Sequence, residues 1–595
     1  MGEVHREPTG TATRILSISV SRGSPEPEVS VLAATDQHLE SPRWLVAAVT
    51  SPAPTDIAVI ARWLLGGCDE PTAPREGFAV VAMDRFEGSV HAATSARTEV
   101  ALFYAWSEDR LIISSHLRGV IDQLATRPNL DVGKLADLLC LHDDPSTTAY
   151  QGIKRLPIGH ELRWVPGGQP RVTRWFNPPH QLSARTRSPA GDAELMRNVV
   201  TDAVRASLPT GGDVAAAVSG GLDSTMVAAT AARLLNPLGR SVRGVGFEPL
   251  PGTVALRPGW EPDDGPYARL LAQATPGLTY TPLINSRGRT PLTALPWVFE
   301  HTYAPFLAHS SALWAEEVTL WAQSTGASVL LGGDAGNATF SRDRTGIRHQ
   351  QIITGQWSPV VRDLRIQRRN GDSWRQIVWL LSGALAPDWV HAMRERLSHA
   401  PRSHFFEEIP VRRGAVGERA QANLARIASP GPNRSHKAWV DWVLEDASLY
   451  GCVPDVGLWH SDPLSDPRVV RTALTLPLES WMADGLDRSL ARRAMRGVVP
   501  DEIRLRTTRG EQSADFGRWI VGRQSDYEDA VETVCASQTA AQFLDLPALR
   551  SSVTDGWPEP GRSSQIWDLI FGRALSVGLF AAWWDARPSE RYRAT

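Results

Sequence analysis

The sequence predicts two domains: an N-terminal α+β domain rich in strands, and a C-terminal α/β domain built on a doubly wound parallel sheet. The chain has 595 residues, 42% of them apolar, which is enough for more than one hydrophobic core. Residues 1–178 hold short β-prone runs separated by turn residues. Across residues 193–595, β-prone runs alternate with helical patterns, which favours parallel strands covered by helices on both faces.

Five segments support the N-terminal prediction. Phe78–Asp84, Val100–Trp106 and Arg110–Ser114 are short runs rich in β-branched, aromatic and other apolar residues, and they predict strands. Val132–Leu141 has a helical pattern. Pro166–Gly168 is a turn signal between two further β-prone runs, so it predicts a hairpin.

The C-terminal domain follows a Pro/Ser/Arg-rich linker at residues 179–192 and opens with an amphipathic helix, Glu194–Leu208. The predicted strands are Val214–Val218, Ser241–Phe247, Tyr280–Leu283 and Ser328–Leu331. The predicted helices between them are Asp223–Leu235, Pro266–Ala274 and Val318–Ser324. Residues 340–440 are predicted to be an insertion without a recognisable motif, with helices at Ser373–Ser382 and Ala386–Leu397. From Ala438 to Phe516 the pattern is again predominantly helical.

Composition excludes several classes of protein. The formal net charge of -3 offers no general attraction to nucleic acid. The four cysteines are far apart in the sequence and form no CxxC pair, which disfavours a structural zinc site or a disulfide framework. We find no signal peptide and no run long enough to cross a bilayer, so we expect a cytoplasmic protein without a membrane partner.

The segment from Val214 to Ala229 places a glycine turn between a buried strand and a helix. Gly220 and Gly221 let the backbone approach a ligand closely, and the first N–H groups of the helix point at it. Ser219 and Ser224 add hydroxyl donors. The segment therefore predicts a phosphate site formed by Val218, Ser219, Gly220, Gly221, Leu222, Asp223 and Ser224. It is not a Walker A loop, because no Gly-Lys-Ser/Thr follows.

A second polar turn, Gly332–Asn337, follows the fourth predicted strand. Open parallel sheets bind ligands outside the carboxyl ends of their strands, so we expect both turns at one edge of the sheet. Asp223 in the first turn can hold a divalent cation against bound phosphates.

The sequence SGGLDS, Ser219–Ser224, resembles the PP-loop of ATP pyrophosphatases, enzymes with an adenine-nucleotide α-hydrolase-like fold that adenylate a carboxylate or carbonyl oxygen. This resemblance implies ATP and Mg²⁺ as cofactors, with Gly332 and Gly333 of the second turn also lining the nucleotide. Phe247 and Val245 end the second strand, where they contact either adenine or the core of the sheet.

The N-terminal domain resembles the glutaminase domain of asparagine synthetase B. The matching residues are Thr148, Tyr150, Gly152, Ile153, Arg155, Leu156, Pro157, Gly159 and His160. The resemblance implies an αββα sandwich of the Ntn-hydrolase type. In that family a cysteine directly after the initiator methionine attacks glutamine, whereas this chain has Gly2 there. We expect the fold to be kept and the glutaminase reaction to be lost.

The C-terminal half resembles the synthetase domain of the same family. The matching residues are Pro463, Leu464, Asp466, Arg488, Arg492, Val499, Pro500, Ile503 and Arg506. The family's second magnesium carboxylate falls on Asn337, so the implied metal ligands are Asp223 and Asn337. The glutamate that serves the amine falls on Asp334.

The family's catalytic lysine falls on Thr508, with Arg506 and Arg509 beside it as cations that can stabilise the leaving adenylate. The implied catalytic residues are therefore Asp334, Arg506 and Arg509. Asp466, Glu445 and Asp446 also belong to the region of the implied site, where each serves either catalysis or a salt bridge or helix cap.

Within the family, the chain is most similar to lasso peptide cyclases (macrolactam synthetases). The shared features are the missing terminal cysteine, the GGDAGN turn, the HSDPLSDP stretch, the central insertion and the length. The resemblance implies an AMP-forming ligase that adenylates an Asp or Glu side chain of a precursor core peptide and joins it to the N-terminal amine. It also implies a leader-binding protein and a leader peptidase as partners. The alternatives are a β-lactam synthetase-like cyclase, an ammonia-dependent asparagine synthetase, and a catalytically silent scaffold that binds precursor peptide.

Overall fold

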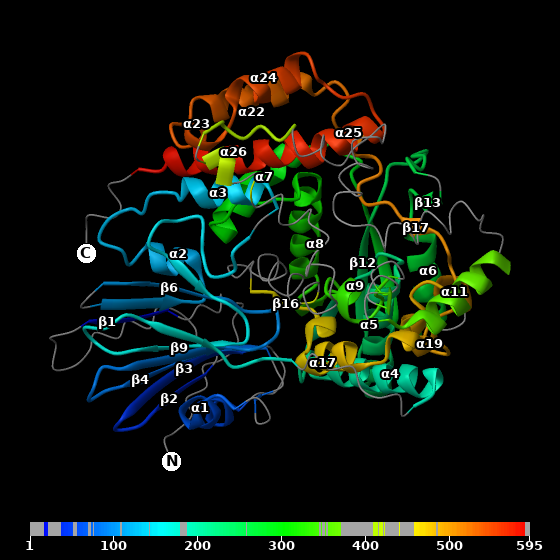
Figure 1. Cartoon of the computed structure of the whole chain (residues 1–595), viewed down its shortest axis with the longest axis horizontal. Coiled ribbons are helices and arrows are strands. Elements are labelled where there is room, and N and C mark those ends of the chain that lie inside the picture. Colours follow the sequence, from blue (N-terminus) through cyan, green and yellow to red (C-terminus); the bar gives the residue numbers. More distant parts are fainter. Residues whose placement is uncertain are drawn as a thin grey trace.

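The fold is taken from a computed structural model of the whole chain (Figure 1). The structure describes residues 17–21, 37–50, 56–69, 73–74, 77–107, 110–141, 143–178, 187–257, 259–343, 347, 351–352, 355–369, 408–414, 416–419, 422, 440, 457–482 and 486–588. The predicted helices Ser373–Ser382 and Ala386–Leu397, together with Gly2, Glu445 and Asp446, lie outside these residues.

Two antiparallel sheets form the N-terminal domain. The six-stranded sheet has the order β10 (Arg171–Arg174), β9 (His160–Trp164), β5 (Val90–Thr94), β4 (Phe78–Asp84), β3 (Trp44–Thr50), β2 (Gln37–Glu40). The four-stranded sheet has the order β1 (Ser17–Ser21), β7 (Arg110–Ser114), β6 (Leu102–Trp106), β8 (Lys154–Leu156).

The period-2 pattern of β3 explains how these layers pack. Leu45, Ala47 and Val49 face the four-stranded sheet and share one apolar core with it. Val46 and Ala48 point the other way, against helix α1 (Ile57–Gly66). The outer face of the four-stranded sheet packs on α2 (Leu117–Ile121) and α3 (Val132–Leu139). The predicted αββα sandwich is therefore present (Figure 1).

The C-terminal domain contains a five-stranded parallel sheet in the order β14, β12, β11, β15, β16. Its strands are β14 (Leu278–Ile284), β12 (Val242–Glu248), β11 (Asp213–Ala217), β15 (Ala327–Leu331) and β16 (Trp459–Ser461). On one face it packs against α4 (Pro189–Arg205), α5 (Leu222–Leu235) and α6 (Gly265–Ala274). Helix α8 (Ala312–Ser324) covers the other face. The strand order reverses between β11 and β15, and at such a switch point the loops separate and leave room for a ligand.

Most boundaries differ from the sequence predictions by one or two residues, and α8 starts at Ala312, six positions before the predicted Val318. Two differences have a clear local cause. Helix α4 starts at Pro189, inside the predicted linker and earlier than Glu194, because Ser188 caps it by accepting a hydrogen bond from the Gly191 N–H at 3.2 Å. The helical prediction from Ala438 is wrong at β16, which is the fifth strand of the sheet. Three residues are too few to carry a periodic pattern, and pairing with β15 decides their conformation.

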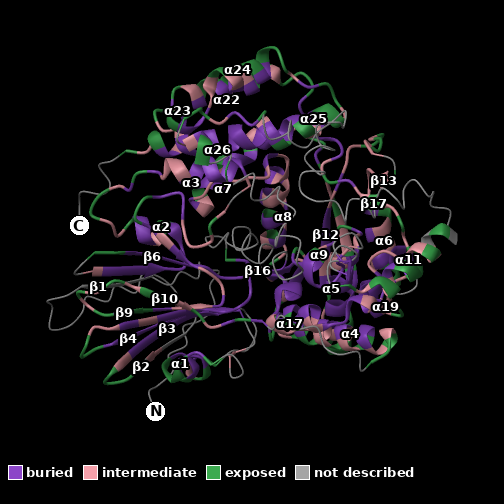
Figure 2. Ribbon diagram, viewed as in Figure 1, coloured by how far each residue is buried: buried purple, intermediate pink, exposed green. Residues whose placement is uncertain are grey.

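A helical layer from the C-terminal part of the chain lies over both domains (Figure 1). It includes α7 (Pro291–Thr302), α22 (Gln524–Cys535), α24 (Leu546–Thr554), α25 (Arg562–Trp567) and α26 (Arg573–Asp585). Residues 562–585 form one continuous helix that is long and apolar enough to cross a bilayer, which corrects the expectation that no such run exists. Two-thirds of its apolar window, 67%, is buried inside the protein, as in a core helix (Figure 2).

A buried ionic network joins the N-terminal domain to the end of β16. The Arg97 guanidinium pairs with Glu99 and lies 3.2 Å from Asp466 Oδ2. It also donates to Ser461 Oγ at 3.2 Å, and Trp459 Nε1 donates to Glu99 Oε2 at 3.0 Å. The N-terminal domain therefore holds β16 in place, and β16 ends at Ser461, directly before Asp462.

Candidate active site

The first turn lies at the carboxyl end of β11. Val218 is buried and donates its N–H to the Val245 carbonyl at 2.7 Å, which extends the pairing of β11 with β12. Gly220 has φ +70°, and a Cβ atom there would lie 2.7 Å from the Asp264 carbonyl oxygen. Only glycine fits this turn, since both its backbone conformation and its surroundings exclude a side chain.

Gly221 and Leu222 begin helix α5, and the described residues provide no side-chain cap for its N-terminus. The first N–H groups of the helix are therefore free to bind an anion. The hydroxyls of Ser219 and Ser224 lie 2.9 Å apart, and Ser224 Oγ accepts the Ser219 N–H at 3.1 Å. The predicted phosphate loop thus has the geometry of an anion site.

The second turn packs directly on the first. A Cβ atom on Gly333 would lie 3.0 Å from the Ser224 backbone nitrogen, and one on Gly336 would lie 2.4 Å from Asp223 Oδ1. Gly332 donates its N–H to the Ser461 carbonyl at 2.8 Å, which ties the turn to β16. The structure therefore brings both predicted turns together at the switch point of the sheet.

Asp223 lies between the two turns with its carboxylate enclosed. Oδ2 accepts a hydrogen bond from Ser341 Oγ at 2.8 Å, whereas the buried Oδ1 has no partner among the described residues. Burial raises the pKa of Asp223 to about 6, against the opposing positive charge of Arg488. A carboxylate oxygen without a partner among the described residues, with the charge of a second carboxylate, Asp334, close enough to raise the pKa of Asp223, is a donor set that suits Mg²⁺. The residues present therefore fit the cation that the sequence implies.

Asp334 and Asp462 form a close pair of carboxylates beside Asp223. Asp462 is buried and accepts hydrogen bonds from the Ala335 N–H at 2.7 Å and the Leu464 N–H at 2.9 Å. Burial and the neighbouring charge of Asp334 raise the pKa of Asp462. Although more than a third of the Asp334 residue is exposed, protein atoms crowd its carboxylate and raise its pKa as well. Two carboxylates with raised pKa values are suited to hold or accept a proton near neutral pH.

Arg506 contacts Asp264 and Tyr267, whose atoms lie close to Gly220 of the first turn. Its guanidinium lies 2.7 Å from Asp264 Oδ1 and stacks on the Tyr267 ring at 4.1 Å. It also lies 3.3 Å from Glu261 Oε2. An open pocket of about 560 Å³ lies against it, lined by Glu261, Tyr267, Asp501, Glu502, Leu505, Arg506, Thr507 and Thr508.

Arg509 and Arg488 lie at the rim. Arg509, in β17 (Arg509–Gly510), is half-exposed and pairs with Asp487 at 3.1 Å. Arg488 donates to Asn337 Oδ1 at 3.3 Å, and its charge lowers the pKa of Asp223. Asn337 itself is exposed.

Three further sequence candidates have structural surroundings. Phe247 packs edge-on against Trp519 with ring centroids 5.7 Å apart, and Val245 is buried in the sheet core. Asp466 caps α17 (Pro467–Thr475) and pairs with Arg97 and Arg468. Of the two roles that the sequence leaves open for Asp466, these contacts correspond to the salt bridge and helix cap.

Sequence reasoning missed Asp462, Ser341 and the position of Arg488 next to Asn337. Asp462 lies in the HSDPLSDP stretch, directly after β16, and a polar residue at the end of a parallel strand is a signal for a site. The helical prediction for this segment hides that signal. Ser341 carries no signal in the sequence, since its contact with Asp223 spans 118 positions.

The parallel sheet with two glycine turns at its switch point defines an open α/β ligand-binding domain. A sequence model of the asparagine synthase family matches residues 195–585, and the chain belongs to this family. Members of this family are ATP-dependent, amide-forming ligases. A comparison with curated proteins found no match.

Solved structures with a similar arrangement include an allosteric regulatory enzyme of purine biosynthesis, at 10% identity and a TM-score of 0.16. That similarity covers 45% of this chain and 65% of the other, so this chain spans less than two-thirds of its length. A glutamine phosphoribosylpyrophosphate amidotransferase from B. subtilis is similar at 11% identity and a TM-score of 0.17, over 55% of this chain and 86% of the other.

Proposed function

We propose that this protein is an ATP- and Mg²⁺-dependent lasso peptide cyclase. It adenylates an Asp or Glu side chain of a precursor core peptide and joins it to the peptide's N-terminal amine, with release of pyrophosphate and AMP. The observation that carries the ATP chemistry is the enclosed carboxylate of Asp223 between two glycine turns, with an Oδ1 that has no partner among the described residues. Peptide specificity is supported by the sequence features shared with lasso cyclases, namely the GGDAGN turn, the HSDPLSDP stretch and the central insertion.

The residues of the two turns suit the first half-reaction. The substrate carboxylate attacks the α-phosphorus of ATP, an acyl-adenylate forms, and pyrophosphate leaves. The N–H groups at the start of α5 and the hydroxyls of Ser219 and Ser224 hold the leaving pyrophosphate. Bound Mg²⁺ would supply charge neutralisation at the phosphates, with Asp223 as its main protein ligand and Asn337 and Asp334 beside it. Arg506, aided by Arg509, would stabilise negative charge that develops around the α-phosphate.

The second half-reaction needs an amine, a base and little water. The peptide ammonium must lose a proton before its nitrogen attacks the acyl carbon and AMP leaves. Asp334 is suited to accept that proton because its carboxylate has a raised pKa and lies next to Asp462. Holding the amine against the activated carbon supplies much of the rate by proximity. The proposal includes a cytoplasmic protein that works with a leader-binding protein and a leader peptidase, as the family resemblance implies.

A mass-spectrometric assay tests the proposal. The purified protein is incubated with ATP, Mg²⁺ and a leaderless core peptide, and we expect a product lighter by one water together with AMP. Asp223→Ala should abolish AMP release. Asp213→Ala is the matched control, because Asp213 begins β11, at the end of the strand away from the first turn, and pairs with the half-exposed Arg243.

Parallel reactions separate the alternatives. AMP release that depends on aspartate and ammonia, and not on peptide, would identify an asparagine synthetase, which is equally consistent with the family match. AMP release with a small β-amino acid carboxylate would identify a β-lactam synthetase-like cyclase. Peptide binding without AMP release under any of these conditions would identify a silent scaffold.

A further inference from the structure

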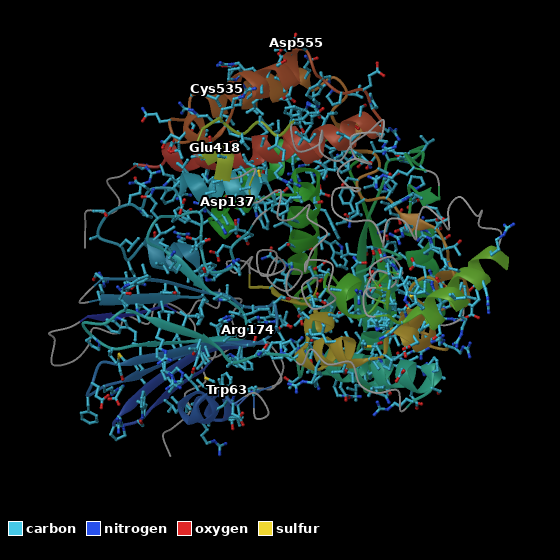
Figure 3. The ribbon with its side chains drawn as sticks, in the orientation of Figure 1. Trp63, Asp137, Arg174, Glu418, Cys535 and Asp555 are labelled. Atoms are coloured by element: carbon cyan, nitrogen blue, oxygen red, sulfur yellow. The ribbon has the colours of Figure 1, made fainter. Side chains whose placement is uncertain are left out.

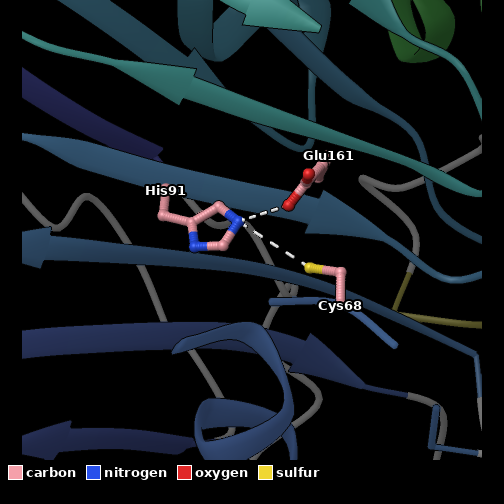
Figure 4. Close-up of side chains that lie close together, drawn as sticks. All are labelled: Cys68, His91 and Glu161. Carbon is pink, nitrogen blue, oxygen red and sulfur yellow. Dashed lines mark hydrogen bonds and ion pairs between the residues drawn. The ribbon is translucent and has the colours of Figure 1, made fainter. Parts of the chain in front are cut away.

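A second cluster of chemically active side chains lies in the N-terminal sandwich, in the domain that has no assigned reaction. It consists of Cys68, His91 and Glu161, which come from three different elements (Figure 4). Their ligand atoms all lie within 4.8 Å of one another. The residues are 23 and 70 positions apart, so no spacing in the sequence announces them.

The architecture of the sandwich explains why they meet. His91 on β5 and Glu161 on β9 lie on the face of the six-stranded sheet that packs against α1, because His91 pairs with Ala82 and Glu161 with Ala93, and both alanines contact α1. Cys68 follows the end of α1 in the left-handed backbone region, with φ +56°. This uncommon conformation for a non-glycine residue directs the thiol to the sheet.

The arrangement is that of a cation site and not of a nucleophile relay. In a Cys-His-carboxylate relay, one ring nitrogen faces the thiol and the other faces the carboxylate. Here the same atom, His91 Nε2, lies 3.7 Å from Cys68 Sγ and 2.8 Å from Glu161 Oε2 (Figure 4). Three donor atoms that converge on one point are what a metal ion requires.

The separations fit a tetrahedral ion after a small adjustment. Bond lengths of about 2.3 Å to sulfur and about 2.0 Å to nitrogen or oxygen put the nitrogen about 3.5 Å from the sulfur and about 3.3 Å from the oxygen. The first of these matches the 3.7 Å separation, and the second requires the His91–Glu161 contact to open by about half an ångström. Thr173 Oγ1 donates to Glu161 Oε1 at 2.8 Å, which orients the carboxylate and leaves Oε2 to the ion.

Charge and access also suit a divalent ion. A thiolate, a carboxylate and a neutral imidazole carry two negative charges, which balance the ion. Burial lowers the pKa of His91, so the ring is in its neutral, metal-binding form at neutral pH. The nearby cation is Arg163, 3.3 Å from Glu161 Oε2, and it is 54% exposed and able to move into solvent. His91 and Glu161 keep 12% and 14% of their side chains exposed, which leaves an entry path and a position for water.

We propose that Cys68, His91 and Glu161 bind a thiolate-accepting divalent metal ion of the Zn²⁺ class, with water as a fourth ligand. Binding replaces the thiol proton: Cys68 loses H⁺ to solvent as the sulfur–metal bond forms, with no change of oxidation state. The ion would pin the end of α1 to strands β5 and β9. A spacing between cysteines would not signal such a site, because only one cysteine takes part.

Cobalt binding tests the proposal on the full-length protein without an affinity tag. After dialysis against a chelator, the variant C140S/C452S/C535S, in which Cys68 is the only cysteine left, should bind one equivalent of Co²⁺ and show sulfur-to-cobalt charge-transfer absorption. Zn²⁺ should displace the Co²⁺ and remove the absorption. The replaced cysteines Cys140 and Cys535 are not members of the cluster, and Cys535 lies at the opposite end of the molecule from Trp63 of α1 (Figure 3).

The reciprocal variant Cys68→Ser keeps the other three cysteines and should lose the absorption. His91→Gln and Glu161→Gln should weaken Co²⁺ binding at least tenfold. Zn²⁺ should raise the melting temperature of the wild type but not that of Cys68→Ser. Absence of the absorption in the triple variant would overturn the proposal, as would unchanged absorption in folded Cys68→Ser. If Cys68→Ser does not fold, the sulfur-to-cobalt absorption of C140S/C452S/C535S is the measurement that tests the proposal. Asp223→Asn should keep the Co²⁺ site, which separates this outcome from the ATP chemistry.

Discussion

The buried Oδ1 atom of Asp223 faces Gly336 so closely that a Cβ atom on Gly336 would lie 2.4 Å from it. The two residues belong to different glycine turns, 113 positions apart in the sequence. The space that the Asp223 carboxylate occupies is free only because residue 336 has no Cβ atom. A carboxylate can approach this backbone only because glycine has no side chain.

Gly336→Ala should therefore inactivate the nucleotide site without unfolding the protein. The added methyl group displaces Asp223 from the position between the turns, and we expect MgATP affinity and AMP release to fall at least tenfold, about 1.4 kcal/mol. Calorimetric titration with MgATP and an AMP assay measure both. Gly211→Ala is the control, because a Cβ atom there meets no described atom within 4 Å. Wild-type AMP release by Gly336→Ala would show that Asp223 does not act from this position.

Alanine variants of Gly220 and Gly239 distinguish the effect of backbone strain from the effect of a steric clash. Their φ angles are +70° and +69°, but a Cβ atom on Gly220 would lie 2.7 Å from the Asp264 carbonyl, whereas on Gly239 it meets no described atom within 4 Å. Both alanine variants should lose about 1 kcal/mol of unfolding free energy from the left-handed backbone. Only Gly220→Ala should also lose ATP binding. Equal ATP affinity in the two variants would show that the first turn does not bind ATP.

Activity should fall in acid because Asp223 must be ionised to bind Mg²⁺. With its pKa raised to about 6, Asp223 is mostly protonated at pH 5, and the apparent Mg²⁺ affinity should drop about tenfold between pH 7.5 and pH 5. Mg²⁺ titrations at fixed saturating ATP, corrected for the titration of ATP itself, measure the shift. A flat profile over this range would contradict the assignment of Asp223.

The same group makes a prediction about stability. Its folded pKa of about 6 lies above the ordinary aspartate pKa of 3.8, so the folded state binds the proton more tightly and the stability contributed by this group declines as pH rises from about 4 to 6. Asp223→Asn removes that penalty. We expect this inactive variant to unfold at a higher denaturant concentration than the wild type at pH 7.5, and at a similar one near pH 4. Lower stability of Asp223→Asn at pH 7.5 would contradict the raised pKa.

Arg97 should be essential to the junction between the domains. Its removal leaves Glu99 buried without its cation and leaves Asp466 with Arg468 alone, which costs about 3–5 kcal/mol. Arg97→Met should lower both the stability to denaturant and the rate of AMP release, because Ser461 of the network precedes Asp462 of the site. Arg118→Met is the control: its ion pair with Asp122 is half-exposed, and a change within about 0.5 kcal/mol is expected. Wild-type stability of Arg97→Met would mean that the network does not hold the domains.

Local sequence patterns predict many of the helices and strands of the fold. The bounds of β4 and β7 match the predicted Phe78–Asp84 and Arg110–Ser114, and α5 and α6 each differ from prediction by one residue at their start. These elements are long enough for their own apolar period to specify them. The glycine turn of the first loop was also readable, because a strand, two glycines and a helix leave the backbone few alternatives.

Contacts between distant segments were not readable in the same way. Asp462 meets the Gly332–Asn337 turn across 127 positions, and Cys68 meets His91 through the packing of α1 on a sheet. Each of these side chains has ordinary neighbours in the sequence, so its role depends on which element folds against it.

By itself, the sequence determined the mixed α/β character of this protein and the glycine turn between β11 and α5, since both are encoded in short runs of consecutive residues. The tertiary structure alone decided that Asp334 pairs with Asp462, that Asp466 joins a buried salt bridge, and that three scattered side chains converge on one point. The physical reason is that carboxylates, thiols and imidazoles acquire their pKa values and ligands from atoms within a few ångströms, and folding selects those atoms.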